Sequence, residues 1–440
     1  MKSTTFKLNI LFIAFISLLL LPFLTQAETN ENVTAIKVKR IVPVSLPPIE
    51  NGIILVKGNT IEAIGNDIPI PSNATVYEYP DGIAYPGMIN PMTSLGITGI
   101  SSVKEENDIN ETGKFNPHVS VYTAFYPWNN LIPNTRDFGT IVGLIVPEGE
   151  LICGKAALVS FYGWTPEDMI IKKEAALRIN IPELVFGRRR GPIPNDALMK
   201  SIETKKNELR DFISKAYRYY LRSTSQAPLE SSSDDTTFDS YYSRYEAMLP
   251  VWKENFPVII RAQSAENIRF AIQLGKDFKM NVILADAYDG ENVLKEIKES
   301  RFPVILSTMF AGNKEWSDGV DKVFRLPGKL AKEGVLFSFS SFASSTAYDY
   351  ALQAGRAVAY GLSQEDAIKG LTVYPAKILG LDRYGSLEKG KTASFIIASG
   401  NLLETDTVIK DVFMNGKKVT AKSFYQQEYQ RAKDKISGQY

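Results

Sequence analysis

Charged and polar residues follow several apolar, strand-like runs in this chain. Arg261 and Asp286 each come after such a run, and Glu183 ends the segment Ile181-Pro182-Glu183. At the carboxyl end of a barrel strand, a carboxylate can act as a general base and an arginine can hold an anion or an oxyanion. The same residues can also form a structural ion pair. The sequence leaves both interpretations open and favours the ion pair.

Histidine and cysteine are almost missing, since the 440 residues include one of each. His118 follows a proline in a long inserted region, and we expect a surface or packing histidine there. Cys153 has only His118 as a possible histidine partner, so a buried structural thiol is favoured over a nucleophile. One cysteine also leaves no internal disulfide, and the fold must be stabilised by burial of its core.

The pattern of apolar residues predicts β structure at both ends and a barrel between them. Residues 33–80 show short alternating runs with hairpin signals, and residues 385–420 return to this pattern around the turn Asn415-Gly416. Between them, apolar strand candidates alternate with amphipathic helices, which indicates a parallel sheet with covered faces. Five or more such units in about 300 residues favour a closed (β/α)₈ barrel. The strand candidates include 140–146, 257–260, 281–284, 302–306 and 335–339.

We therefore predict an α/β fold, a distorted (β/α)₈ TIM barrel with a small β-sandwich domain built from both chain ends. The inserted region should contain a charged helix at 201–220, and the C-terminal tail should form a surface helix. The predicted boundaries are 1–27 for a leader, 28–85 and 385–422 for the sandwich, 86–384 for the barrel, about 186–250 for the insertion and 423–440 for the tail.

The first residues have the pattern of a secretory signal peptide. Lys2 and Lys7 precede an apolar run at 8–23, which ends at the small-residue exit Thr25-Gln26-Ala27. The run is shorter than the roughly 20 residues that span a bilayer, so a membrane anchor is the lesser alternative. We expect cleavage near Glu28 and a secreted or periplasmic protein with no membrane span after cleavage. Lys plus Arg is 50 and Asp plus Glu is 49, and nothing indicates a nucleic-acid surface.

Three segments carry a family resemblance. Residues 84–96, with the sequence AYPGMINPMTSLG, are similar to a first barrel strand of the form Pro-Gly-Leu-Ile-Asp-x-His-x-His-x-Gly; residues 372–381 and 385–394 are similar to a closing helix and the strand entry after it. Together they resemble the amidohydrolase superfamily, in its imidazolonepropionase-like branch, over about residues 36–420. Residues 147–157 add weaker similarity to a glycine-containing loop of that branch. The resemblance implies a hydrolase of cyclic amides or other non-peptide C–N bonds.

In that family, histidines hold a divalent metal, and the metal lowers the pKa of the attacking water. The resemblance places Met92 and Ser94 where the first strand carries its two histidines. The segment 258–266 is similar to the family's Val-x-Ile-His-Ala-His, but it offers Arg261 and Gln263. The metal ligands of two strands therefore have replacements that are unsuited to zinc.

The remaining family positions are altered as well. A later histidine is expected at Ala285 or Asp286, and Phe342 lies at or near the position of the aspartate that activates water. Glu183 matches an acidic bridging ligand only loosely. Oxygen atoms of Asp286, Glu183 and Ser94 could hold calcium or magnesium, but the fixed charge of Arg261 opposes a cation nearby. We expect no metal cofactor.

The leading hypothesis is a non-hydrolytic member of the family that acts as a binding or partner protein. Arg261, Gln263, Ser94 and Met92 would then contact a small polar ligand at the barrel mouth. The partner would be an active homologue or a second copy of the chain. The alternative is a metal-independent hydrolase that uses Asp286 or Glu183 as base and Arg261 to steady an oxyanion. A ligand-binding barrel with no partner is a third possibility.

Overall fold

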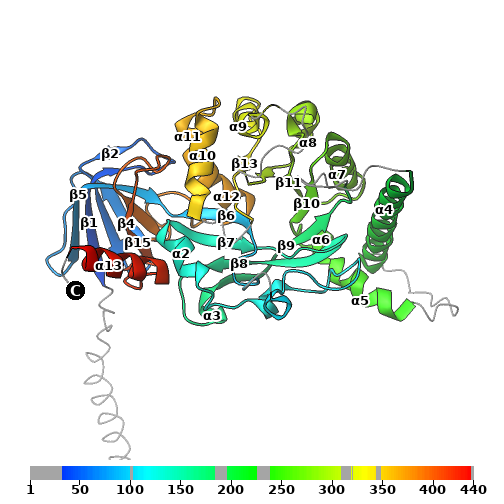
Figure 1. Cartoon of the computed structure of the whole chain (residues 1–440), viewed down its shortest axis with the longest axis horizontal. Helices are drawn as coiled ribbons and strands as arrows, with labels where there is room; N and C mark the ends of the chain where they lie inside the picture. Colours follow the sequence, from blue (N-terminus) through cyan, green and yellow to red (C-terminus); the bar gives the residue numbers. More distant parts are fainter. Residues whose placement is uncertain are drawn as a thin grey trace, which may run out of the picture.

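A computed structural model describes residues 32–99, 103–183, 196–224, 238–308, 319, 321–342 and 348–437. The molecule is elongated, with a β-sheet and the C-terminal helix at one end, the barrel in the centre and two helices of the insertion at the other end (Figure 1). The predicted leader, residues 1–27, lies outside the described residues. Within those residues, no helix is both long and apolar enough to cross a membrane.

The central sheet of the described chain has eight strands in the order β13-β12-β11-β10-β9-β8-β7-β6. Its parallel pairs are β6 with β7, β9 with β10, β10 with β11, β11 with β12 and β12 with β13. The sheet therefore has the predicted barrel organisation over most of its length. The strands are β6 (Met88–Thr93), β7 (Thr140–Ile145), β8 (Ile152–Ser160), β9 (Ile170–Asn180), β10 (Val258–Ala262), β11 (Val282–Asp286), β12 (Val304–Leu306) and β13 (Phe337–Ser338).

One strand runs against the expected direction. β8 pairs antiparallel with both β7 and β9. The connections explain this, because a parallel crossover needs a dozen or more residues, whereas only 146–151 separate β7 from β8 and only 161–169 separate β8 from β9. The expectation of a wholly parallel sheet is wrong here. Residues 152–157, which resemble part of a family loop, lie in this strand.

Side-chain hydrogen bonds bring the two ends of the barrel sheet together. Asn90 of β6 donates through Nδ2 to the Ser341 carbonyl at 3.0 Å, and its Oδ1 accepts from the Ser341 backbone N–H at 3.2 Å. The Ser94 backbone N–H donates to the Phe342 carbonyl at 3.0 Å. Ser341 and Phe342 follow β13, so these contacts nearly close the eight-stranded barrel.

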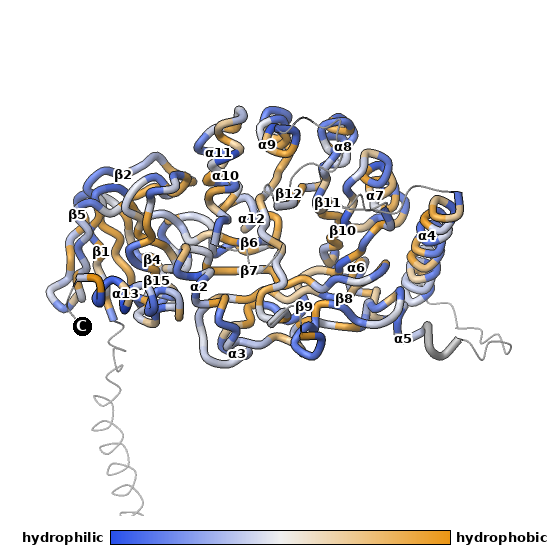
Figure 2. Tube along the Cα trace, viewed as in Figure 1, coloured by the Kyte–Doolittle hydropathy of each residue, from blue (hydrophilic) through white to orange (hydrophobic). Residues whose placement is uncertain are grey.

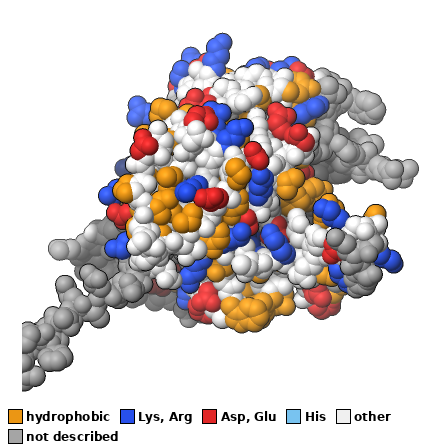
Figure 3. Space-filling view, turned by 90° about the vertical axis from the view of Figure 1, so that its left-hand side faces the viewer, with side chains coloured by type: hydrophobic (Ala, Val, Ile, Leu, Met, Phe, Trp, Pro, Cys, Tyr) orange, Lys and Arg blue, Asp and Glu red, His pale blue; other side chains and the backbone are white. Residues whose placement is uncertain are grey.

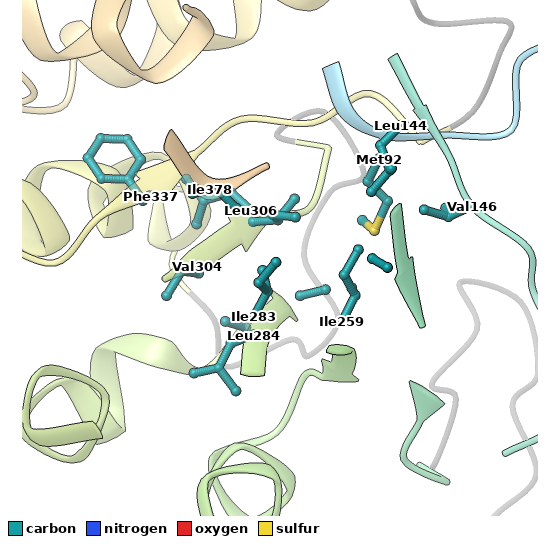
Figure 4. Packing of buried hydrophobic residues seen from close by; sticks show 14 of the residues in the cluster. Met92, Leu144, Val146, Ile259, Ile283, Leu284, Val304, Leu306, Phe337 and Ile378 are labelled. Atoms are coloured by element: carbon teal, nitrogen blue, oxygen red, sulfur yellow. The ribbon is translucent and has the colours of Figure 1, made fainter. Parts of the chain in front are cut away.

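Apolar side chains fill the barrel, and helices cover it. Figure 4 shows Met92 with Leu144, Val146 and Ile259 in the buried cluster. Hydrophobic residues gather along the central strands, whereas hydrophilic residues mark the outer helices (Figure 2). The covering helices are α7 (Ala265–Asp277), η4 (Gly290–Val293), α8 (Leu294–Ser300), α9 (Lys322–Lys332), α10 (Tyr350–Val358), α11 (Gln364–Leu371) and α12 (Val373–Ile378).

The two chain ends join in a second sheet. Its order is β16-β15-β14-β5-β1-β3-β4, with β2 paired to β1. The sheet curls, because the Ile61 N–H donates to the Lys391 carbonyl and the Ala393 N–H donates to the Asn59 carbonyl, both at 2.9 Å. Both ends thus contribute as predicted, but a two-layered sandwich is not confirmed. The strands are β1 (Val33–Ile41), β2 (Ile49–Glu50), β3 (Ile53–Lys57), β4 (Thr60–Gly65), β5 (Thr75–Pro86), β14 (Phe395–Ala398), β15 (Ile409–Met414) and β16 (Lys417–Lys418).

The insertion and the tail are helical. α4 (Asp196–Thr224) extends beyond the predicted 201–220, and its Lys206 Nζ donates to the Glu266 carboxylate at 2.6 Å. α13 (Phe424–Ile436) is the surface helix that the sequence predicts. The remaining helical segments are η2 (Lys104–Glu106), η3 (Val121–Ala124), α2 (Leu131–Asp137), α3 (Pro166–Met169), α5 (Phe238–Met248) and α6 (Pro250–Lys253).

Candidate binding site at the barrel mouth

The ends of adjacent strands bring an arginine and an aspartate together. β10 and β11 are parallel and in register, with Ala262 opposite Asp286. Arg261 Nε donates to Asp286 Oδ2 at 2.6 Å, and Gln263 Nε2 donates to the same oxygen at 2.9 Å. The ion pair that the sequence favours is therefore present. The contact brings together three of the predicted site residues, Arg261, Gln263 and Asp286.

The two partners differ in their access to solvent. The Asp286 side chain is 9% exposed, whereas that of Arg261 is 41% exposed. Burial opposes the charge on Asp286, but Arg261 and Arg178 outweigh it and hold the pKa of that carboxyl below its ordinary value. Burial likewise opposes the charge on Arg261, and its pKa is nevertheless raised because Asp286 and Glu148 lie close. Both groups are thus charged at neutral pH.

A second ion pair, which was not predicted from the sequence, lies beside the first. Arg178 of β9 donates through Nη2 to Glu148 Oε1 at 3.1 Å and through Nη1 to the Met92 sulfur at 3.2 Å. Asn180 Nδ2 donates to Glu148 Oε2 at 3.0 Å. Glu148 lies 3.9 Å from Arg261 Nη1, so the two pairs form one network. The Arg178 side chain is 1% exposed, and this charge is wholly inside the protein.

A signal for the second pair does exist in the sequence. Arg178 interrupts the apolar run of residues 175–179, and a charge in such a run needs a buried partner. The partner, Glu148, lies about 30 positions earlier, in the connection after β7. Glu148 lies in the short connection between β7 and β8, beside the end of β9. We name Arg178, Glu148, Arg261 and Asp286 the mouth network.

The backbone at the mouth is strained. Asp286 has a φ of 71° and Ala287 a φ of 35°, a region that residues with a Cβ rarely adopt. Hydrogen bonds hold this turn, since the Ala287 N–H donates to the Ala262 carbonyl at 3.1 Å and the Asp289 N–H donates to the Gln263 carbonyl at 2.8 Å. Such conformations cost roughly 1–3 kcal/mol and gather at functional sites. This turn carries the Asp286 carboxylate that contacts Arg261.

The other predicted site residues have separate partners. A Glu183 carboxylate oxygen accepts, at 2.6 Å, the backbone N–H of Ser264, the residue whose side chain caps the N-terminus of α7. Ser94 bonds the Phe342 carbonyl through its backbone N–H and, at 3.3 Å, through its hydroxyl. Met92 is 1% exposed and accepts from Arg178. A role for these residues in contact with a ligand remains a prediction.

The single cysteine and the single histidine lie in different environments. Cys153 is buried, and burial raises the pKa of its thiol to about 12, so the thiol stays protonated. This agrees with the structural thiol that the sequence favours. His118 lies on the surface. Partial burial and the nearby Arg244 lower the pKa of His118, which leaves the imidazole neutral at pH 7.

The residues of the mouth network do not fit a divalent metal. Its two carboxylates are already bonded to guanidinium groups, which cannot lose their charge and repel a cation. Asp286, Glu183 and Ser94, the possible oxygen ligands, each bond a different group. Among the described residues, no group of three or more His, Cys, Asp or Glu side chains is placed to hold a metal ion. We therefore derive no chemistry through a metal.

Sequence comparison finds a family similarity in the C-terminal part of the chain. Residues 319–419 match the model of the amidohydrolase family. The match covers about a quarter of the chain. It includes the similar stretches at 372–381 and 385–394, whereas the first-strand stretch at 84–96 lies outside the match. The amidohydrolase resemblance is thus supported in this segment, whereas the imidazolonepropionase-like branch and the loss of metal ligands are not confirmed. No curated protein sequence matches the chain.

Solved structures extend the amidohydrolase likeness in fold. An amidohydrolase from Thermotoga maritima MSB8 is 22% identical, with a TM-score of 0.75, over 88% of this chain and 100% of that one. The ochratoxinase of A. niger is 14% identical, with a TM-score of 0.53, over 88% and 95%. Phenylurea hydrolase B is 13% identical, with a TM-score of 0.51, over 88% and 97%. At these identities the comparison shows a shared fold.

Proposed function

We propose that this protein is an amidohydrolase-fold binding protein, in which the mouth network takes the place of a metal centre. The observation that carries the proposal is the chain of contacts from Arg178 through Glu148 and Arg261 to Asp286. It occupies the strand ends, where barrel folds place their sites. Two arginines and two carboxylates balance their charges, so the network is complete without a cation.

The exposed side of the network supports a role in binding. Arg261 keeps 41% of its side chain in contact with solvent, while its Nε is committed to Asp286. Its remaining N–H groups can meet a polar ligand, with Gln263 two residues further on, just after β10. A carbonyl or carboxylate group fits this side chain best, because guanidinium presents donors only. The proposed ligand is therefore a small molecule that carries such an acceptor.

Metal analysis tests the proposal directly. Protein purified without chelator, and a second sample incubated with zinc and then desalted, are analysed by inductively coupled plasma mass spectrometry. We expect transition metals well below one ion per chain in both samples. One or more tightly bound ions per chain would overturn the proposal. A chelator-treated sample supplies the baseline.

The metal-independent hydrolase is the alternative, and the same site would serve it. The low pKa of Asp286 makes this carboxylate a weak base, and the carboxylate of Glu183 already accepts the Ser264 backbone N–H. The alternative predicts hydrolysis of amide or ester substrates that survives chelators and is lost in both Asp286→Asn and Glu183→Gln. Turnover with this pattern would replace the binding role with a catalytic one.

We further propose that the protein is exported and loses residues 1–27. The basic start, the apolar run and the small-residue exit support this. N-terminal sequencing of protein recovered from the native host should begin near Glu28. A chain that keeps Met1 and fractionates with membranes would contradict export by cleavage.

A further inference from the structure

The C-terminal helix α13 lies on the molecule without packing into it. Its 13 residues, Phe424–Ile436, include none that is buried. Its start is fixed: the Ser423 backbone N–H donates to Asp137 Oδ2 at 2.8 Å, and the Ser423 hydroxyl caps the first turn. The nearby Ala421 carbonyl accepts from Arg136 Nη2 at 2.9 Å. The helix is therefore anchored at one end and presents most of its surface to solvent.

The exposed surface of α13 carries an ordered apolar stripe. Tyr425, Tyr429, Ala432 and Ile436 follow one another at spacings of four, three and four residues. This is the spacing of a two-helix seam. The side chains of Tyr425, Tyr429 and Ile436 are 53%, 64% and 88% exposed. Exposed apolar residues in such an order, on a helix that supports nothing else, indicate a contact surface.

We propose that this stripe is a self-association surface, at which α13 packs antiparallel against α13 of a second copy. The inference concerns a face separate from the barrel mouth and stands independently of the proposed binding role. α13 lies at the end of the molecule with the curled sheet (Figure 1), and Figure 3 faces that end, where hydrophobic side chains lie among Lys, Arg, Asp and Glu.

Side-chain size favours a second copy in this orientation. In an antiparallel pair, Tyr429 faces Ala432 of the second copy, and Tyr425 faces its Ile436, so large and small residues alternate across the seam. A parallel pair would set Tyr429 against Tyr429 and leave a gap between two alanines. The helix dipoles also oppose each other only in the antiparallel arrangement.

The charged residues beside the stripe also favour an antiparallel pair. Glu428 and Lys435 flank the stripe on one side, seven residues apart. In an antiparallel seam, these flanking positions meet across the pair, so Glu428 faces Lys435 of the second copy, and the reverse contact forms as well. Glu428 bonds Arg431 in an exposed pair, which is worth little. The stripe is thus complementary to itself in shape and in charge.

The association should be weak. Thirteen residues form a helix about 20 Å long. Two such helices bury less than the roughly 1,600 Å² of a standard stable interface. We expect a monomer–dimer equilibrium that depends on concentration and is populated only at high micromolar to millimolar protein.

Sedimentation equilibrium of the purified protein tests the proposal. The wild type should show reversible dimers at concentrations up to about 1 mM, whereas Ile436→Glu should be monomeric. Because residue 436 is exposed, this variant should keep its far-ultraviolet circular dichroism. A wild type that stays monomeric throughout overturns the proposal, as does a dimer that persists in Ile436→Glu.

Charge reversal then tests the orientation. Glu428→Lys and Lys435→Glu should each weaken dimerisation several-fold, and the double variant should restore it. Lys433→Glu is the matched control, because Lys433 meets Glu428 only in a parallel pair. If Lys433→Glu lost its dimers while Lys435→Glu kept them, the antiparallel arrangement would be overturned. If a different protein bound α13 tightly and the chain did not self-associate, the proposal that a second copy occupies this surface would be overturned.

Discussion

Two charged networks in this protein pair basic side chains with carboxylates in different surroundings. At the barrel mouth, Arg178 is 1% exposed and Asp286 9% exposed. Along α9, Lys322 bonds Asp289 and Lys329 bonds Glu291, with the lysines 15% and 40% exposed. Exposed pairs contribute little, because water solvates each partner well when the pair breaks. Burial therefore decides how much folding stability is lost when each network is interrupted.

A buried network is costly to interrupt and poor at adding stability. The transfer of two charges out of water offsets most of their attraction, so well-packed apolar residues often stabilise a protein as well as a buried ion pair does. The mouth network is thus better explained by the polar groups that it presents to a ligand than by a contribution to folding stability. The α9 network ties α9 to η4 at the surface of the molecule.

The largest expected effect comes from Glu148→Gln. This change removes the charge that compensates Arg178, which cannot reach water, while it keeps the shape of the side chain. The free energy of unfolding, measured with urea, should fall by about 3–5 kcal/mol. A loss below about 1 kcal/mol would show that water reaches Arg178 and would remove the distinction between the two networks.

The double variant Glu148→Leu with Arg178→Met is the matched control. It removes both charges and replaces them with apolar side chains of similar length, so no charge remains buried alone. It should recover most of the stability that Glu148→Gln loses. A double variant that is less stable than Glu148→Gln would show that the pair itself, and not the unpaired charge, determines stability.

The next effect is expected from Asp286→Asn, and it should depend on pH. Arg261 loses its charged partner but remains 41% exposed, so the loss should be about 1–3 kcal/mol at pH 7. The folded-state pKa of Asp286 is lowered, so its contribution is present above the unfolded pKa of about 3.9 and is lost as pH falls through the folded value. The difference between wild type and variant should therefore shrink in acid. A difference that grows as pH falls would contradict the lowered pKa.

These two residues also show what the sequence can and cannot reveal. Arg261 and Asp286 end neighbouring parallel strands, and strand order alone brings them together. Glu148 meets Arg178 from a connection about 30 residues earlier in the chain, and no residue pattern in that connection marks it as the partner. In the same way, nothing in the sequence distinguishes Asn90 from other polar residues, whereas the structure shows that it bonds the backbone of Ser341. The local pattern of apolar residues predicts the barrel, whereas the contacts of Glu148 and Asn90 depend on residues far apart in the sequence and appear only in the structure.

The smallest effect is expected from Lys329→Gln in the α9 network. The side chain is 40% exposed, and water can replace the Glu291 contact when the charge is removed. The loss of unfolding free energy should stay below about 1 kcal/mol at low salt. It should fall further at 1 M salt, where the Debye length is only about 3 Å. The effect of Glu148→Gln, by contrast, should hardly change with salt, because the mouth network is screened by protein and not by solution ions. Equal salt dependence of the two variants would show that ions reach the barrel mouth, and the comparison between a buried and an exposed network would then fail.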